Sequence, residues 1–206
     1  WLSCEASRGM EFNAWSAGNP PEHETILPFT RIMGGGFDYT PGIFETRMNV
    51  HDKNKKEIVH TTVAKQLALY VTLYSPLVMA ADLPEVYEKR MDVFQFIKDV
   101  PVDWKDSKVL NAEIGDYVSY ARKDKFSDNW FIGSITDENP RKFEFTLDFL
   151  DDGASYTATL YEDGADAHWE KNPYPVKITK TKVKKGDKLT ANLAAGGGMA
   201  VSLIKE

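Results

Sequence analysis

The sequence predicts two regions of different fold class, an α/β region followed by an all-β domain. Between residues 61 and 100, a helical pattern, a short apolar run and a second helical pattern follow one another. This alternation of helix, strand and helix is typical of an α/β barrel. After Pro101 the chain changes to short segments that alternate apolar and polar residues. We therefore expect an α/β region over residues 1–104 and an antiparallel β-sandwich or Greek-key domain over residues 105–206.

The first 44 residues show little periodicity and are punctuated by glycine and proline, including the run Gly34-Gly35-Gly36. Within them, Glu22–Met33 is expected to hold a short helix that Pro28 breaks or kinks. Long irregular segments in compact domains usually carry function, so we expect functional loops here.

Two helices are predicted before Pro101. Thr61–Tyr74 is expected to be helical because its apolar residues recur at three- and four-residue spacing. The apolar run Leu77–Ala81 that follows is expected to be a buried strand. The second helix is expected over Pro84–Val100, where one proline opens the segment and another follows it.

Eight strands are predicted from residue 108 onward, because apolar and polar residues alternate in short segments. Turn-forming glycine, asparagine and aspartate residues separate these segments. The expected strands are Lys108–Ile114, Tyr117–Arg122, Trp130–Ser134, Lys142–Leu147, Tyr156–Tyr161, Val176–Thr181, Lys188–Leu193 and Met199–Ile204.

The composition excludes some classes of function. Apolar residues make up 42% of the 206 residues, which is enough to bury a core. The net charge of −6 disfavours nucleic acid, whose binding depends on cationic side chains that neutralise phosphates. The lysine-rich segment 180–185 alternates with Thr and Val and is expected to be the solvated face of a strand. No apolar run reaches the roughly 18 residues that a membrane span requires.

The single cysteine, Cys4, excludes an internal disulfide and a zinc cluster. The chain begins at Trp1 without a signal-peptide pattern, so we expect a fragment that holds part of a working site. Aromatic residues make up 12% of the chain; they are candidates for stacking on sugars, although core packing is their more common role.

The segment 5–12, Glu-Ala-Ser-Arg-Gly-Met-Glu-Phe, holds two carboxylates six residues apart in a loop that contains glycine. Hydrolysis of a glycosidic bond needs an acid for the leaving oxygen and a base or nucleophile opposite it. A calcium ion needs several oxygen ligands, which Glu5 and Glu11 can supply. Spacing alone does not separate these roles from the commoner case of two solvated surface glutamates. Arg8 either pairs with a carboxylate or stays on the surface.

Several neighbouring residues carry two interpretations. His23 either lines the mouth of a site or makes a structural hydrogen bond, which is the favoured interpretation. Asp38 and Tyr39 either shape a substrate channel or set a turn. Glu22 and Glu24 are expected to be exposed at the start of a helix, where negative charge is favourable. The remaining histidines show no ligand spacing.

Nine segments together resemble glycoside hydrolase family 97, including the loops late in its catalytic barrel. They follow the same order as in that family and cover nearly the whole chain, which is more specific than any single motif. The runner-up interpretation is a barrel-derived enzyme of another family with a C-terminal β-sandwich, such as the α-amylase-like or family 31 enzymes, which share the architecture but not these loops. The segments are 5–12, 19–23 (Asn-Pro-Pro-Glu-His), 26–31 (Ile-Leu-Pro-Phe-Thr-Arg), 38–42 (Asp-Tyr-Thr-Pro-Gly), 65–71, 75–77, 80–84, 94–100 and 196–198.

The resemblance implies that residues 1–104 are the C-terminal portion of a (β/α)8 glycosidase barrel. It implies that residues 105–206 are a C-terminal antiparallel β-domain associated with homo-oligomerisation. Members of the family are calcium-dependent, exo-acting α-glucosidases or α-galactosidases that act on oligosaccharides. The position of Glu11 corresponds to the proton donor and that of Glu5 to a calcium ligand, and the rest of the machinery lies upstream. The usual location of family members also implies that the protein lies in the periplasm of a Gram-negative bacterium.

A second interpretation belongs to a different class: a non-catalytic β-sandwich module for oligomerisation or carbohydrate binding, preceded by a scaffold remnant. The placement of Glu5 and Glu11 separates the two interpretations. Side chains that converge in a concave site favour the enzyme, and divergent exposed side chains favour the module.

Overall fold

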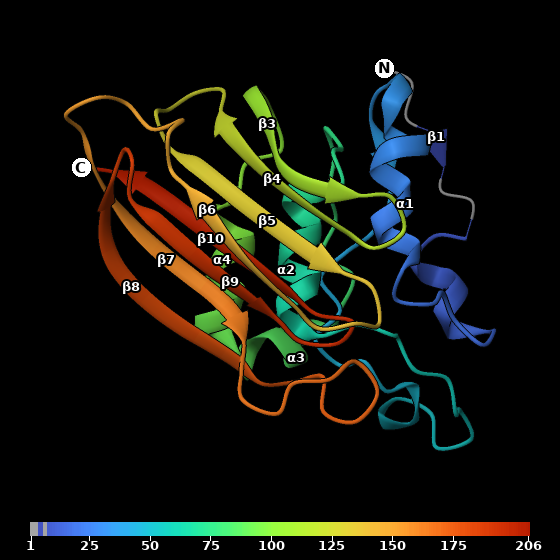
Figure 1. The fold of residues 1–206 in the computed structure, drawn as a ribbon. Coiled ribbons are helices and arrows are strands. Elements are labelled where there is room, and N and C mark those ends of the chain that lie inside the picture. The colour runs from blue at the N-terminus through green and yellow to red at the C-terminus, as the bar shows by residue number, and fades with distance from the viewer. Residues whose placement is uncertain (1–3, 6–7) are drawn as a thin grey trace.

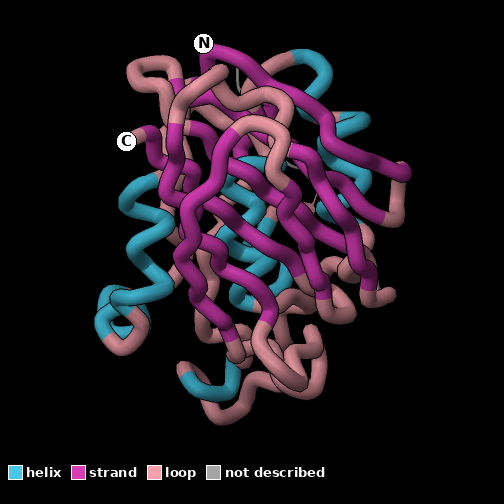
Figure 2. Tube along the Cα trace, turned by 60° about the vertical axis from the view of Figure 1, so that its left-hand side comes forward, coloured by secondary structure: helices cyan, strands magenta, loops and turns pink. Residues whose placement is uncertain are grey.

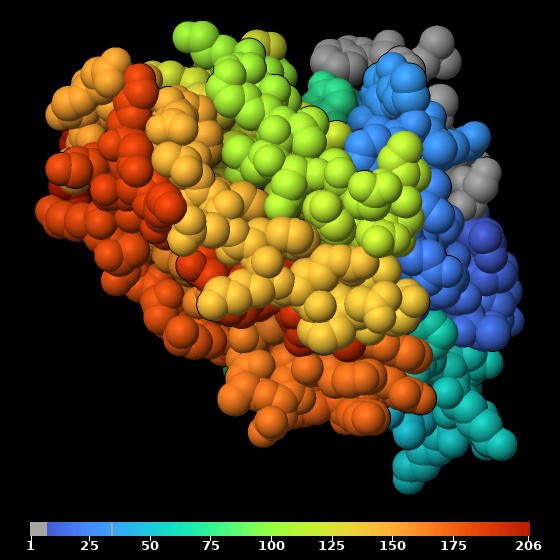
Figure 3. Space-filling view, in the orientation of Figure 1, coloured from blue at the N-terminus to red at the C-terminus, as the bar shows by residue number. Residues whose placement is uncertain are grey.

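The computed structural model describes residues 4–5 and 8–206, and its centre is a six-stranded antiparallel sheet (Figure 1). Helices lie on one face of this sheet and a two-stranded sheet lies on the other. Figure 2 shows the strands across the front of the molecule with helices behind them. The blue N-terminal region and the orange-red edge strand β8 lie at opposite sides of the molecular surface (Figure 3).

All eight strands predicted after Pro101 are confirmed, and all pair antiparallel. β3, β4, β5, β10, β7 and β8 form the large sheet in this order, and β6 pairs with β9. The last strand of the chain therefore lies between β5 and β7, and the successive strands β5 and β6 belong to different sheets. Their bounds are β3 (Trp104–Glu113), β4 (Tyr117–Asp124), β5 (Trp130–Thr136), β6 (Arg141–Thr146), β7 (Ser155–Asp163), β8 (Val176–Lys184), β9 (Lys188–Leu193) and β10 (Gly198–Lys205).

The region before residue 104 contains short elements joined by long loops. A two-residue parallel pair, β1 with β2, joins Cys4 to Phe37 and Glu5 to Asp38. The elements are β1 (Cys4–Glu5), η1 (Met10–Ala14), α1 (His23–Thr30), η2 (Ile32–Gly34), β2 (Phe37–Asp38), η3 (Met48–Val50), α2 (Val63–Thr72), α3 (Pro84–Glu88) and α4 (Met91–Asp99). In the described residues, no helix has the length and apolar character needed to cross a membrane.

The two faces of the large sheet bury two separate hydrophobic cores. On β5, Phe131 and Ile135 belong to the core on the side of the helices. Trp130 and Ile132 belong to the core between the two sheets. Side chains of a strand alternate between faces, so a strand that is covered on both sides is buried along its whole length. All seven residues of β5 are buried for this reason.

Helix α2 is the element that joins the N-terminal region to the sheet. Thr62 caps it, since its side chain accepts a hydrogen bond from the backbone N–H of Lys65. Every residue of α2 is buried, because the helix packs on β5 and β10 and is covered by the N-terminal segments. Its polar side chains, Lys65 and Gln66, therefore need partners inside the protein.

Two glycines allow the sheet to approach α2 closely. A Cβ atom at Gly133 would lie 2.6 Å from the carbonyl oxygen of Ala68, and one at Gly198 would lie 2.6 Å from the Cα atom of Lys65. Side chains at these positions would push the helix and the sheet apart.

Two expectations for the N-terminal region are wrong. Leu77–Ala81 is not a strand: Leu77 is 77% exposed, and the run is joined to Pro41 by one backbone hydrogen bond at its end. An apolar run forms a strand only where a neighbouring strand pairs with it. The helix expected over Pro84–Val100 is two helices, α3 and α4, because the backbone of Arg90 leaves the helical region.

Of the other expectations for this region, one helix is confirmed and the barrel stays untested. The helix expected over Glu22–Met33 is found as α1 followed by the 3₁₀ turn η2, and Pro28 lies inside α1. The (β/α)8 barrel stays a prediction, since the described residues contain one parallel strand pair, β1 with β2.

Candidate functional site

The loop that precedes Glu11 is fixed by hydrogen bonds to its backbone. The Asn19 side chain donates to the carbonyl oxygens of Arg8 and Gly9 at 2.9 and 3.2 Å. The Nε2 atom of His23 lies 3.0 Å from the same carbonyl oxygen of Arg8. Arg8 has a φ of 57°, which is costly for a residue with a side chain. These bonds hold the backbone of Arg8 and Gly9, and η1 begins directly after Gly9.

Glu11 lies at the border of a cavity of about 460 Å³. The cavity is lined by residues that follow β1 and β2 in the chain and by the segment after residue 80. Segments that directly follow β1 and β2 in the chain therefore supply most of its wall. Its lining residues are Met10, Glu11, Asn13, Ala14, Thr40, Ile43, Glu45, Met48, His51, Ala81, Asp82 and Leu83.

Two further carboxylates in the cavity wall have fixed positions. The Oδ2 atom of Asp82 accepts hydrogen bonds from the backbone N–H groups of Phe44 and Glu45 at 2.8 and 2.7 Å. The Oε1 atom of Glu45 accepts from the Tyr174 hydroxyl at 2.6 Å. Asp82 therefore shapes the backbone of the wall, and Glu45 presents a carboxylate from it.

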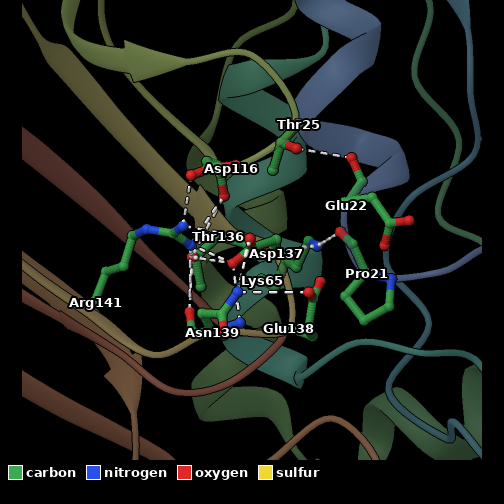
Figure 4. A network of polar contacts seen from close by, with 10 residues as sticks. All are labelled: Pro21, Glu22, Thr25, Lys65, Asp116, Thr136, Asp137, Glu138, Asn139 and Arg141. Carbon is green, nitrogen blue, oxygen red and sulfur yellow. Dashed lines mark hydrogen bonds and ion pairs between the residues drawn. The ribbon is translucent and has the colours of Figure 1, made fainter.

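A buried polar network lies under this site and reaches the β-domain. The Nζ atom of Lys65 donates to the carbonyl oxygens of Pro21 at 2.6 Å and Thr136 at 3.1 Å. It also lies 3.2 Å from the Oε2 atom of Glu24, whose Oε1 atom accepts from the Tyr39 hydroxyl. Figure 4 shows Lys65 between Pro21 on one side and Thr136 on the other. Burial, and then the charge of Glu24, raise the pKa of Tyr39 well above its ordinary value.

Arg141 continues this network on the β-domain (Figure 4). Its guanidinium donates to Asp116 at 2.9 Å, to Thr136 at 2.6 Å and to Asp137. The carbonyl oxygen of Asp137 accepts from the N–H of Gly196 at 2.7 Å. The network thus joins the ends of β4, β5 and β6 and the glycine-rich turn before β10.

The described residues near Glu11 include carboxylates, which are the kind of ligand that calcium binds. Too few of these carboxylates lie together to hold an ion by themselves. Carboxylate oxygens are the ligands that calcium prefers. The side chain of Glu5 lies outside the described residues. Among the residues that are described, no group of three or more His, Cys, Asp or Glu is placed to hold a metal ion. The role of Glu5 as a calcium ligand therefore stays a prediction.

The structure brings together some of the predicted site residues. Glu11 is exposed at the cavity, and Arg8 is exposed with its guanidinium 5.8 Å from the centre of the Phe12 ring. His23 makes the structural hydrogen bond that was favoured. The exposed position expected for Glu24 is wrong, since this residue is 3% exposed and pairs with Lys65.

Sequence reasoning missed Glu45, Asp82 and His51, which also line the cavity. Their positions follow from contacts between segments that are far apart in the chain. The one available signal was that Asp82 lies within a segment that resembles family 97.

Comparisons of this chain with known proteins agree on one protein family. Residues 103–204 match the family model described as the glycosyl-hydrolase 97 C-terminal domain, oligomerisation. A retaining α-galactosidase from Bacteroides thetaiotaomicron is 34% identical over an alignment of 206 positions that covers 98% of this chain and 30% of that protein. A probable retaining α-galactosidase from Streptomyces bingchenggensis is 28% identical over 88% of this chain and 26% of that protein.

The fold agrees with these matches. A glycoside hydrolase family 97 enzyme from Pseudoalteromonas sp. strain K8, solved in complex with panose and with acarbose, superposes with a TM-score of 0.93 at 46% identity. The match covers 100% of this chain and 32% of that one. The chain therefore belongs to glycoside hydrolase family 97. It spans about a third of the length of the relatives it matches.

Proposed function

We propose that the full-length protein is a calcium-dependent, exo-acting α-glycosidase that hydrolyses α-glucosides or α-galactosides, with Glu11 as the general acid. The observation that carries the proposal is the position of Glu11 in the wall of a cavity lined by the segments that follow β1 and β2. A carboxylic acid there can donate a proton to the oxygen of the departing sugar. Relatives are named α-galactosidases or were solved with panose and acarbose, which supports this class of substrate.

The residues around Glu11 support its role as the acid. Met10, Ile43 and Leu83 make much of the cavity wall apolar, and Glu45 is a second carboxylate in the same wall. The hydrogen bonds of Asn19 and His23 hold the loop that leads to Glu11 in one position.

The proposal is tested with Glu11→Gln in the full-length protein. Activity on substrates with poor leaving groups, such as panose, is expected to be abolished, while activated aryl glycosides keep more activity because their leaving groups need no proton. Equal losses on both kinds of substrate speak against an acid role. The residue Glu22, which is partly exposed at the start of α1, supplies the matched control Glu22→Gln.

Calcium is the proposed cofactor, with Glu5 as one of its ligands. A bound cation would supply positive charge beside the reacting centre. The test is removal of metal from the full-length protein by a chelator, followed by return of calcium. Activity is expected to fall and then recover, and an unchanged rate after complete metal removal excludes the role of Glu5 as a calcium ligand.

A second function is supported by the family model, whose description names oligomerisation for the domain over residues 103–204. We propose that the β-domain also contributes to a homo-oligomer of the full-length protein. Sedimentation of the full-length protein over a range of concentrations tests this: an oligomer is expected, and a monomer at every concentration contradicts it. A periplasmic location stays a proposal that cell fractionation tests.

A further inference from the structure

A hydrogen bond joins the β-domain to the wall of the cavity. The hydroxyl of Tyr174 donates to the Oε1 atom of Glu45 at 2.6 Å, across 129 positions of sequence. Tyr174 lies in the loop between β7 and β8, which is part of the C-terminal domain, while Glu45 lines the same cavity as Glu11. Burial and this hydrogen bond raise the pKa of Tyr174, so its hydroxyl remains a donor at neutral pH.

The loop that carries Tyr174 is docked on the N-terminal region. The carbonyl oxygen of Tyr174 accepts from the Arg90 guanidinium at 3.1 Å. The carbonyl oxygen of Pro173 accepts from the N–H of Val63 at 2.9 Å. The Arg47 guanidinium donates to the carbonyl oxygen of Glu170 at 2.9 Å. Three contacts from three different segments thus fix the backbone of the loop that carries Tyr174.

Glu45 is held in one orientation with half of its carboxylate still available. Its backbone N–H donates to Asp82, and its Oε1 atom accepts from the N–H of Arg47 at 3.2 Å as well as from Tyr174. The Oε2 atom makes no hydrogen bond to any described residue. A carboxylate fixed through one oxygen is preorganised to accept hydrogen bonds with the other.

We propose that Glu45 binds hydroxyl groups of the sugar on the leaving-group side of the scissile bond, and that Tyr174 is the positioning residue that orients it. The inference rests on the proposed function, because a general acid at Glu11 places the leaving-group oxygen in this cavity. Ionised carboxylates are strong acceptors for hydroxyl donors. Ile43, Met48 and Leu83 add an apolar wall that suits the C–H face of a sugar ring.

The test compares two kinds of substrate in the full-length enzyme with Glu45→Gln and with Tyr174→Phe. Oligosaccharides, namely panose and an α-galactosidic trisaccharide, carry hydroxyls on the leaving group, and an aryl α-glycoside lacks them. KM for the oligosaccharide is expected to rise about tenfold, the size expected when a hydrogen bond to a charged group is lost. The rise for the aryl glycoside is expected to be severalfold smaller.

The control is Tyr156→Phe, which removes another bond between a tyrosine hydroxyl and a carboxylate, that of Asp151, at a site remote from the cavity. Glu45→Gln keeps an oxygen for Tyr174 and Arg47, so it decides the outcome if Tyr174→Phe fails to fold. Calorimetric titration of panose or the α-galactosidic trisaccharide into Glu11→Gln, with and without Glu45→Gln, is expected to show the same tenfold loss of affinity. Equal effects on both kinds of substrate, or no effect, overturn the inference, whereas full activity of Glu11→Gln would overturn the proposed function instead.

Discussion

The ammonium group of Lys65 lies 3.2 Å from a carboxylate oxygen of Glu24, and both side chains are almost completely buried. Lys65 belongs to α2 and Glu24 to α1, so this ion pair joins the helix under the sheet to the segment that follows the Glu11 loop. Burial of two charges is costly unless additional hydrogen bonds satisfy the remaining donors of the ammonium group and acceptors of the carboxylate. Pro21, Thr136 and Tyr39 provide those bonds.

Replacement of Lys65 by methionine is expected to destabilise the full-length protein by about 3–5 kcal/mol, because it leaves the buried carboxylate of Glu24 without its counter-charge. Chemical unfolding measures the loss. The double variant Lys65→Met with Glu24→Gln is expected to recover part of this stability, since the amide that replaces the carboxylate carries no charge and still accepts from Tyr39. If the double variant is as unstable as the sum of the two single variants, the pair is not coupled.

The eight strands could be predicted from the sequence because alternation is a local pattern that needs no knowledge of partners. The buried state of Glu24 could not, because its counter-charge lies far along the chain in Lys65. The same holds for Glu45, whose partner Tyr174 is 129 positions away. The prediction of a strand over Leu77–Ala81 is wrong for a related reason, since an apolar run does not show whether a second strand is available to pair with it.

Stability is expected to depend on pH through Asp163, whose Oδ2 atom accepts from the N–H groups of Ala194 and Gly198 at 2.9 Å each. Burial raises its pKa from the ordinary value of 3.8 to about 6, although Thr62 and these two N–H groups oppose the rise. Because the pKa is raised on folding, the contribution to stability is complete below pH 3.8 and is lost as the pH rises through about 6. This difference in pKa corresponds to about 3 kcal/mol.

The matched variant is Asp163→Asn, which keeps an oxygen acceptor for both N–H groups but does not ionise. The difference in Tm between this variant and the unchanged full-length protein is to be measured from about pH 4 to about pH 7, the range that spans the shift. The variant is expected to gain stability relative to the original as the pH rises. A constant difference over this range contradicts the assignment.

Close packing of the sheet on α2 predicts that Gly198→Ala is strongly destabilising. The added Cβ atom would lie 2.6 Å from the Cα atom of Lys65 and 2.8 Å from the carbonyl oxygen of Ser134, and neither backbone atom can rotate away. The expected loss is about 1–3 kcal/mol or more, measured by chemical unfolding. The control Gly186→Ala adds a methyl group in open space at a φ of +84° and is expected to cost about 1 kcal/mol of backbone strain. If Gly198→Ala costs no more than this control, the packing of α2 on β10 is looser than described.

The acid role of Glu11 is tested most directly by the dependence of rate on the leaving group. Aryl α-glycosides whose phenols span a range of pKa values are to be hydrolysed by the full-length enzyme and by Glu11→Gln. With a general acid present, the leaving group is protonated as it departs, and log kcat/KM depends weakly on the pKa of the phenol. The account predicts a much steeper negative slope for Glu11→Gln, with the largest losses for the most basic phenols. Two parallel lines, offset by a constant factor, would contradict it.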